Sequence, residues 1–155
     1  MNIRKFEERD VLDVADLAMR TFQQYNGLDF YNEEAITNTL NYFDTTKNTK
    51  QVLLEKFSKK PISYVAEEEG QIVGMINGVA NRISSLFVDG SQHRKGIGKA
   101  LLENYVFEAK EYDSDFISIE SSLYAAEFYQ KMGFVKTTDI VNHMGLKVYK
   151  MEKKL

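Results

Sequence analysis

The segment from residue 83 to residue 111 constrains the fold of this chain more than any other part of the sequence. An apolar run, ISSLFV, leads into a short polar turn, and two glycines, Gly96 and Gly98, stand where a helical pattern begins. The first amides of a helix lack intrahelical acceptors and carry the positive end of the helix dipole. Glycines let an anion approach these amides closely. We therefore predict a strand, an anion-binding turn and a helix in direct succession, a cradle suited to phosphate or pyrophosphate.

Basic side chains stand beside this turn at Arg94, Lys95 and Lys99. The turn does not match the phosphate loop G-x-x-x-x-G-K-[ST], because Lys95 stands five residues after Gly90, where a second glycine is required. Leu101 occupies the third glycine position of the dinucleotide fingerprint G-x-G-x-x-G, which excludes that motif as well. A glycine-containing strand–helix turn with solvated cations is the structural alternative to an anion site.

Two runs of the sequence resemble motifs of the GNAT acetyltransferases. The run HRKGIG, which begins at His93, resembles motif A, [RQ]-x-x-G-x-[GA] after a strand, although histidine replaces the usual Arg or Gln. A later run resembles motif B, N-x-x-A-x-x-F-Y-x-x-x-G-F, with Ser122 in place of Asn. The resemblance extends from about Pro61 to the C-terminus, and the N-terminal part agrees only in general pattern. The positions that match motif B in register are Ala125, Phe128, Tyr129, Gly133 and Phe134.

The resemblance implies the fold. The fold class is mixed α/β, the GNAT fold, in which about four helices flank a twisted mixed sheet of about six to seven strands. Its fourth and fifth strands, here residues 83–88 and 116–120, splay apart, and the arm of the coenzyme lies in the gap. The chain is expected to form a single GNAT acetyltransferase domain over residues 1–155, a length that can bury a core of its own.

The spacing of apolar residues predicts the individual elements. Asp10 is expected to cap the first helix. Helices are predicted at residues 11–25, 32–43, 51–58, 96–111 and 125–132. Strands are predicted at residues 2–6, 62–68, 71–80, 82–88, 116–120, 134–141 and 144–151. The second and third strands read as a hairpin around an acidic turn with glycine, and the last two as a terminal hairpin.

The implied cosubstrate is acetyl-coenzyme A, and no metal is expected. In the family, the loop of motif A binds the pyrophosphate of the coenzyme. Backbone groups of the splayed strand that lack protein partners bond to the pantetheine arm. Ser122 can still bond to that arm through its hydroxyl, with fewer bonds than Asn. The resemblance assigns coenzyme contacts to Leu86, Phe87, Val88, His93, Arg94, Lys95, Gly96, Ile97, Gly98, Lys99, Ala100, Ser122 and Tyr129.

The implied function is N-acetyl transfer to a primary amine by direct attack through a tetrahedral intermediate, whose oxyanion the backbone amides of the splayed strand stabilise. Tyr129 stands where the family carries its general acid, and a phenol is protonated at neutral pH. Its alternative role is to pack against the sulfur or orient it. An ammonium acceptor must lose a proton. Glu120 is the candidate base, and the alternatives are a substrate-orienting carboxylate, a surface charge or a water relay.

The acceptor is expected to bind between the N-terminal helices and the terminal hairpin. Core packing accounts for most of the aromatic rings in this region, and one or two are available to line an acceptor site. These rings belong to Tyr25, Phe30, Tyr31, Tyr42 and Phe43. A small-molecule amine is favoured over a peptide or protein, because the chain has no extra charged arm. The alternative functions are a non-catalytic acyl-coenzyme A sensor or interaction module, and a scaffold with an empty cleft.

Charge and cysteine content narrow the range of partners. The net charge of −3 gives no general attraction to nucleic acid, and the basic clusters are short. The chain has no cysteine, and the spacing of its two histidines does not indicate a metal site. The N-terminal residues show no apolar signal region, and no segment is long enough to span a membrane. The expectation is a cytoplasmic protein without nucleic-acid or membrane partners, with formation of a homodimer left open.

Overall fold

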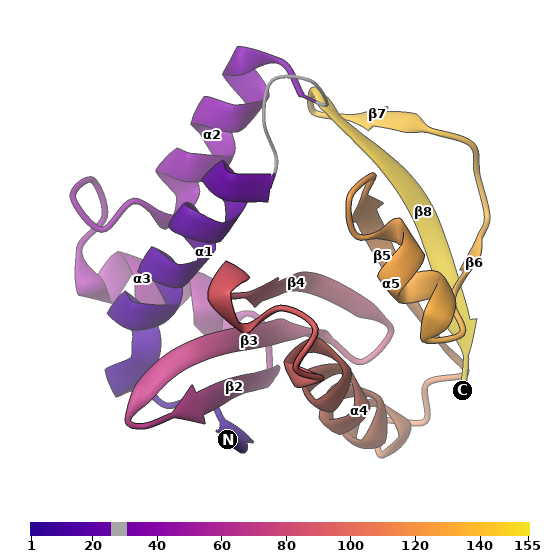
Figure 1. The fold of residues 1–155 in the computed structure, drawn as a ribbon, viewed down its shortest axis with the longest axis horizontal. Helices are drawn as coiled ribbons and strands as arrows, with labels where there is room; N and C mark the ends of the chain where they lie inside the picture. Colours follow the sequence, from indigo (N-terminus) through magenta and orange to yellow (C-terminus); the bar gives the residue numbers. More distant parts are fainter. Residues whose placement is uncertain (26–30) are drawn as a thin grey trace.

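A computed structural model describes residues 1–25 and 31–155 of the chain (Figure 1). Its helices are α1 (Val11–Tyr25), α2 (Glu33–Phe43), α3 (Lys50–Ser58), α4 (Ile97–Lys110) and α5 (Ala126–Lys131). Its strands are β1 (Asn2–Lys5), β2 (Ile62–Glu68), β3 (Gln71–Val79), β4 (Arg82–Val88), β5 (Phe116–Ser122), β6 (Val135–Lys136), β7 (Val141–His143) and β8 (Leu146–Lys154). In the described chain these strands form one mixed sheet in the order β1-β2-β3-β4-β5-β8-β6, with β7 paired to β8.

Helices cover both faces of the sheet. On one face, apolar residues of α1, α2 and α3 pack against β2 and β3, around Leu17, Leu53 and Met75. On the other face, α4 and α5 pack against β2, β3, β4, β5 and β8, around Leu101 and Ile117. Each face of the sheet therefore buries its own apolar cluster, as expected for helices layered on a sheet. The arrangement confirms the predicted mixed α/β class.

Strands β4 and β5 run parallel and separate along their length. β4 pairs with β3 antiparallel from Arg82 to Val88, whereas its registered pairing with β5, in the part of the chain that the structure describes, is confined to Arg82 and Ser118. The Ser118 amide donates to the Asn81 carbonyl at 2.9 Å, next to this contact. Figure 1 shows β4 on the side of α1, and β5 beside β8 and α5. The predicted splay is confirmed, and the end of β4 at Val88 lies beyond the β4–β5 ladder.

The turn that begins β4 is anchored by Tyr105 of α4. This residue is fully buried, and its hydroxyl lies within hydrogen-bonding distance of the carbonyls of Val79 and Arg82. Burial raises the pKa of Tyr105, so the hydroxyl remains a donor. Gly78 stands at an irregularity of the β3–β4 register, and a Cβ there would overlap the Tyr105 hydroxyl and the Arg82 carbonyl. Glycine at this position therefore lets α4 fix the first residue of β4.

The C-terminal hairpin corrects one prediction. The single strand predicted over residues 134–141 is instead two short strands, β6 and β7, each antiparallel to β8. Between them, the Thr137 amide still donates to the Lys150 carbonyl at 2.9 Å, and two threonine hydroxyls make the other contacts with Lys150. The Thr137 hydroxyl donates to the Lys150 carbonyl at 3.2 Å, and the Thr138 hydroxyl accepts from the Lys150 amide at 3.3 Å. The Thr138 hydroxyl takes the Lys150 amide that would otherwise pair with the backbone, and such bonds compete with strand pairing, which explains the break.

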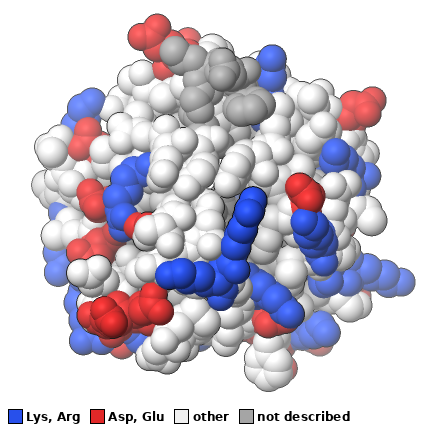
Figure 2. Space-filling view, in the orientation of Figure 1, with Lys and Arg blue, Asp and Glu red and all other residues white. Residues whose placement is uncertain are grey.

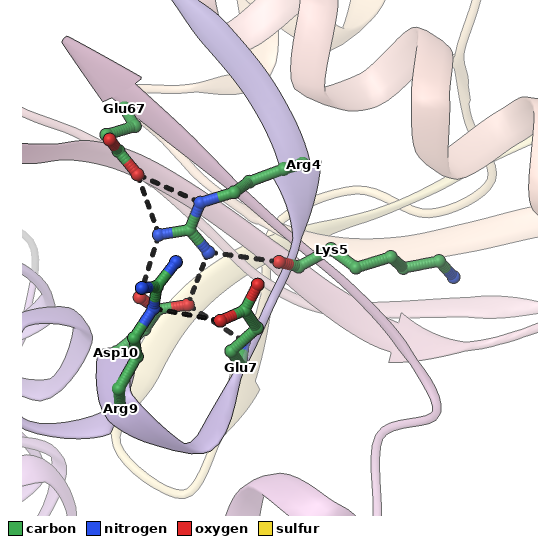
Figure 3. A network of polar contacts seen from close by, with 6 residues as sticks. All are labelled: Arg4, Lys5, Glu7, Arg9, Asp10 and Glu67. Carbon is green, nitrogen blue, oxygen red and sulfur yellow. Dashed lines mark hydrogen bonds and ion pairs between the residues drawn. The ribbon is translucent and has the colours of Figure 1, made fainter. Parts of the chain in front are cut away.

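An ion-pair network joins β1 to the start of α1 and to β2 (Figure 3). The Arg4 guanidinium donates to both carboxylate oxygens of Asp10, at 2.7 and 2.9 Å, and to Glu67 at 2.9 Å. Asp10 also accepts from the Glu7 backbone amide at 2.8 Å. The prediction that Asp10 caps α1 is wrong, because its carboxylate is engaged by Arg4 and Glu7 and a 3-10 turn, Glu8–Asp10, precedes the helix.

Candidate active site

The cradle predicted before α4 lies between the end of β4 and the first turn of that helix. The Asp89 carboxylate accepts from the Ser91 amide at 2.9 Å and caps the 3-10 turn Gly90–Gln92. Two residues with left-handed backbone follow, Arg94 with φ of 64° and Gly96 with φ of 82°. Glycine adopts this conformation freely, whereas a residue with a side chain, such as Arg94, is strained by about 1 kcal/mol. The left-handed Gly96 is the N-cap residue of α4.

The first turn of α4 supplies amides without intrahelical acceptors. The Ala100 amide donates to the Gly96 carbonyl at 3.0 Å, so the three amides before it precede the helical ladder. The predicted coenzyme contact Ala100 therefore has its amide already engaged. The side chain of Ile97, another predicted contact, is buried in the core, which leaves only its backbone for a ligand.

Basic side chains gather over this loop. Arg94, Lys95 and Lys99 are exposed, and Figure 2 shows Lys and Arg side chains clustered near the middle of the face that it presents. The Lys95 ammonium donates to the Gln92 side chain at 2.8 Å, and Lys99 lies 3.8 Å from the Glu103 carboxylate. Such exposed contacts are worth little. The three cations are therefore free to turn toward an anion in the cradle.

Gly98 marks the place where motif A and motif B meet. A Cβ on Gly98 would lie 3.4 Å from the Phe128 ring of α5 and 3.7 Å from the Val88 side chain at the end of β4. Phe128 and Val88 pack against the same apolar cluster as Leu86, and Tyr129 belongs to that cluster. The two motifs, which are far apart in the sequence, thus contact each other beside the splayed end of β4.

Three rings from separate segments stack at the open end of the β4–β5 pair, and we call them the aromatic bridge (Tyr25, His93 and Tyr124). The Tyr25 ring stacks on His93 with centroids 4.7 Å apart and on Tyr124 with centroids 4.9 Å apart. His93 Nε2 lies 2.9 Å from the Val88 carbonyl and therefore donates to it. His93 Nδ1 is then the acceptor for the Tyr124 hydroxyl at 3.4 Å. The bridge links the end of β4 to the turn that follows β5.

The end of α1 is held against the cradle by further contacts. Arg20 of α1 forms an ion pair with Asp89. Hydrogen bonds from Ser91 and the ion pair with Arg20 lower the pKa of Asp89 more than burial raises it. The pKa of Asp89 therefore lies below its usual value. A Cβ on Gly90 would overlap the Tyr25 hydroxyl, so glycine allows this close approach. Tyr25, which the sequence pattern places in the acceptor region, lies against Gly90 and His93 in the loop before α4.

Tyr129 is buried where the two motifs meet. The residue is 3 % exposed, and its ring packs edge-on against Phe128 and Phe134 with centroid distances of 5.1 and 5.4 Å. Burial raises the pKa of Tyr129, so the phenol stays protonated at neutral pH. Within residues 1–25 and 31–155, no group accepts a hydrogen bond from this hydroxyl. The Tyr129 hydroxyl is therefore a protonated donor that a ligand can use.

The end of β5 is tied to the segment before α2. The Ser122 hydroxyl accepts from the Ala125 amide at 3.2 Å and begins the turn into α5. The Tyr31 side chain hydrogen-bonds with Ser122, and Tyr31 also forms a β-bridge with Leu146 of β8. Burial raises the pKa of Tyr31, although the bond with Ser122 opposes this effect. Ser122 thus lies where β5, β8 and Tyr31 meet.

Glu120 of β5 faces away from α4 and α5. Its neighbours Ile119 and Ser121 are buried, and Ile119 belongs to the cluster beneath α4 and α5. The alternation of side chains along a strand places Glu120 on the opposite face. There its carboxylate lies 3.5 Å from Nδ1 of His143 on β7. The sequence predicts Glu120 as a candidate base. It does not predict His143 as a site residue, because one histidine in a short strand carries no spacing signal.

The other aromatic residues predicted for the acceptor region are separated in the structure. Tyr42 lies beneath the Lys56 ammonium, 4.4 Å from the ring centroid, and so packs between α2 and α3. Phe43 is buried and meets Phe87 of β4 edge-on at 5.9 Å. Phe87 therefore directs its side chain toward α1, α2 and α3, on the face that carries Glu120. The predicted Phe30 lies outside the described residues.

Two surface hollows lie away from these residues. One, of about 340 Å³, is lined by residues of α4 that include Phe107, by Met132 just after α5 and by Lys153 of β8. The other, of about 440 Å³, lies by α3 and the end of β1 and includes Phe57. The described residues contain no group of three or more His, Asp or Glu side chains placed to hold a metal ion. None of the helices in the described ranges is both long enough and apolar enough to cross a lipid bilayer.

Comparison with known families agrees with both motifs. A family model described as "Acetyltransferase (GNAT) domain" matches residues 28–155. The match covers most of the chain and contains the glycine cradle, the splayed strands and Tyr129. The chain therefore belongs to the GNAT acetyltransferase family, as the resemblance of its two motifs predicts.

Individual relatives are more distant. The uncharacterized N-acetyltransferase YafP of Escherichia coli (strain K12) is 31 % identical over 80 residues, which are 52 % of this chain and 49 % of that protein. The match thus spans about half the length of this curated relative. A GCN5-related N-acetyltransferase from Rhodopseudomonas palustris has a TM-score of 0.81 at 21 % identity, with 99 % of this chain and 95 % of that chain covered. The PaiA N-acetyltransferase of Thermoplasma acidophilum, solved with coenzyme A, has a TM-score of 0.73 at 20 % identity, with 99 % and 98 % covered. At these identities the two solved structures establish the fold.

Proposed function

We propose that this chain is an acetyl-coenzyme A-dependent N-acetyltransferase that acetylates a primary amine. The observation that carries the proposal is the contact between Gly98 of motif A and Phe128 of motif B, which packs edge-on against the buried Tyr129 at the open end of β4 and β5. Membership of the GNAT family supports the acetyl-transfer chemistry. The coenzyme A complex of the structurally similar PaiA enzyme supports the class of cosubstrate.

The residues of the cradle suit the coenzyme. The unpaired amides of the first turn of α4 and the cations Arg94, Lys95 and Lys99 suit a pyrophosphate. The edge of β4 at residues 86–88 lies outside the β4–β5 ladder, so its backbone groups that do not pair with β3 suit the amides of the pantetheine arm. The Val88 carbonyl among them is held by His93 and becomes available when that bond is released. Ser122, on the facing strand, offers a hydroxyl to the same arm.

The proposed reaction places the acceptor on the face of the sheet opposite to α4 and α5, since those helices fill the other face. The amine attacks the thioester carbonyl carbon, and backbone amides of residues 86–88 stabilise the oxyanion. Tyr129 donates a proton to the departing thiolate, and its raised pKa keeps that proton in place until then. Glu120 supplies the base function on the side from which the amine arrives.

We infer a small-molecule amine as the acceptor. The Glu120 carboxylate attracts an ammonium group, and the partly buried Phe87 ring, which packs on Phe43, gives the same face of the sheet an apolar surface. An acceptor with one cationic amine and a compact apolar body matches this combination of charge and apolar surface.

The test is calorimetric titration with acetyl-coenzyme A, followed by an acetylation assay across a panel of amines. Gly96→Glu places a carboxylate against the cradle amides, and we expect it to weaken acetyl-coenzyme A binding by about 10²-fold, as the loss of charge-assisted hydrogen bonds requires. The matched control is Gly70→Glu. Both glycines have positive φ and open space where a Cβ would stand, but Gly70 lies in the β2–β3 turn.

The proposal expects wild-type protein and Gly70→Glu to bind acetyl-coenzyme A equally, and at least one amine to be acetylated. If Gly96→Glu binds acetyl-coenzyme A with wild-type affinity, the assignment of the cradle to the coenzyme site is wrong. If the wild-type protein binds acetyl-coenzyme A tightly but acetylates no amine, the proposal of an enzyme is wrong, and the chain is a coenzyme-binding module.

A further inference from the structure

His143 is held at the acceptor face by a tied hairpin. It pairs with Leu146 across the β7–β8 turn, and the Asn142 side chain accepts from the Gly145 amide at 2.8 Å inside that turn. Leu146 also forms a β-bridge with Tyr31, which precedes α2. The backbone at His143 is therefore held by two chain segments besides its own strand.

The contact between His143 and Glu120 distinguishes the two ring nitrogens. Nδ1 lies 3.5 Å from Oε2 of Glu120. A carboxylate beside Nδ1 favours the tautomer with its proton on Nδ1, and Nε2 then carries the free lone pair. The His143 side chain is 49 % exposed and that of Glu120 is 37 % exposed. The imidazole is therefore accessible to a solute that approaches this face.

We propose that His143 is the general base that deprotonates the acceptor ammonium, and that Glu120 orients its imidazole and stabilises the imidazolium. This inference rests on the proposed acetyl transfer and assigns a residue to its first step. It divides the base function between two side chains: Glu120 supplies the charge, and His143 takes the proton.

The transfer conserves every proton and electron pair. His143 Nε2 takes one proton from the ammonium, and the freed nitrogen lone pair forms the C–N bond while the carbonyl π pair moves onto oxygen. Collapse of the intermediate breaks the C–S bond, and the thiolate leaves with the electron pair. Tyr129 protonates the thiolate and regains a proton from the cationic amide nitrogen. The imidazolium releases its proton to solvent, so the net products are amide, free thiol and one proton.

Few other titratable groups face this pair in the described chain. Lys150 holds the β8 position paired with Glu120, and directly paired residues share a face of the sheet. Tyr31 is hydrogen-bonded with Ser122 at the end of β5. Lys147 lies one residue from Leu146 on β8 and so projects from the opposite face. Lys147 is therefore a suitable control position.

The experiment measures kcat/KM for an amine that the wild-type protein acetylates, at saturating acetyl-coenzyme A and across pH 5.5 to 9. Variants are His143→Gln, Glu120→Gln, the double variant and the control Lys147→Gln. We expect His143→Gln to lose about 10²-fold in kcat/KM and to lose the acidic limb of the wild-type pH profile. The double variant is expected to lose no more than His143→Gln, because residues that act as a unit are not additive.

Two further readouts separate a chemical role from a structural one. Added imidazole is expected to restore part of the activity of His143→Ala, since that substitution leaves space for the missing base. Calorimetry is expected to show wild-type affinity of His143→Gln for acetyl-coenzyme A. Lys147→Gln is expected to match the wild-type protein throughout.

An active wild-type protein whose pH profile is unchanged in His143→Gln overturns the role of His143 and leaves the proposed function standing. Additive losses in the double variant, or the absence of imidazole rescue, likewise overturn the role of the pair. A wild-type protein that acetylates no amine overturns the proposed function and this inference together.

Discussion

Tyr129 joins two properties that a purely structural tyrosine seldom combines. It is almost fully buried, yet its hydroxyl has no acceptor among the described residues. A ligand that reaches this hydroxyl can therefore accept its hydrogen bond. The edge-on packing of Phe128 and Phe134 holds the ring in place. The phenol is thus oriented before any ligand binds.

The first prediction concerns this hydroxyl. Tyr129→Phe keeps the ring and its packing and removes only the proton donor. We expect kcat for acetyl transfer to fall by about 10²-fold, the usual effect of losing a general acid. The dissociation constant for acetyl-coenzyme A and the melting temperature should change little. Steady-state kinetics with calorimetry checks this, and an unchanged kcat would reduce Tyr129 to a packing residue.

Among the elements, the end of α1 and the end of β4 behave as one assembly. Arg20 pairs with Asp89, the Tyr25 hydroxyl lies against Gly90, and the aromatic bridge continues to Tyr124 beyond β5. His93 occupies the Val88 carbonyl at the edge where we propose that the pantetheine arm binds. Coenzyme binding is therefore expected to require displacement of at least part of this bridge.

The second prediction follows from that requirement. Tyr25→Ala removes the central ring of the aromatic bridge, and each aromatic pair contributes about 1 kcal/mol. We expect the association rate constant for a fluorescent coenzyme A derivative, measured by stopped flow, to rise about fivefold. The control is Tyr42→Ala, which removes a partly exposed ring packed between α2 and α3. Slower or unchanged association in Tyr25→Ala would mean that the bridge does not obstruct the coenzyme.

Across the whole molecule, stability depends on contacts that tie the N-terminus to the sheet. The Asp10 side chain is 5 % exposed, and that of Arg4 is 18 % exposed. Burial disfavours the charged Asp10 carboxylate, but the bonds from Arg4 and the Glu7 amide outweigh it, so the pKa of Asp10 lies below its ordinary value. The hydrogen bonds that the Arg4 guanidinium donates to the carboxylates of Asp10 and Glu67 raise the pKa of Arg4, which agrees in direction. The network therefore stabilises the folded state in its charged form.

The third prediction is the pH dependence of this network. Because the folded-state pKa of Asp10 is lowered, its contribution is complete above the unfolded value of about 3.9 and disappears as pH falls through the folded value. We expect Asp10→Asn to lower the free energy of unfolding by about 2 kcal/mol at pH 7. The difference from wild type should shrink below about pH 4. Urea denaturation at several pH values measures it.

The control for this experiment is Asp139→Asn, an exposed carboxylate between β6 and β7. We expect it to change the free energy of unfolding by less than about 0.5 kcal/mol at every pH. Equal effects of Asp10→Asn and Asp139→Asn would mean that the network contributes nothing specific.

Local sequence pattern alone accounts for the helices, for most of the strands and for the glycine cradle. These features depend on residues that are close in the sequence. Apolar residues recur with the period of a helix or a strand, and Gly96 adopts the left-handed backbone conformation that its own turn needs. The two motifs also predicted the splay of β4 and β5. The division of the strand over residues 134–141 was missed, because it depends on threonine hydroxyls that bond to Lys150 of another strand.

Only the tertiary structure decided which distant residues meet. Tyr25 stacks on His93, Glu120 lies beside His143, and Arg4 joins Asp10 to Glu67. Each pair is brought together by the order of the strands and the docking of α1, which no local spacing encodes. The physical reason is that side-chain partners are chosen by packing in space, whereas periodicity reports only which face of an element a residue occupies.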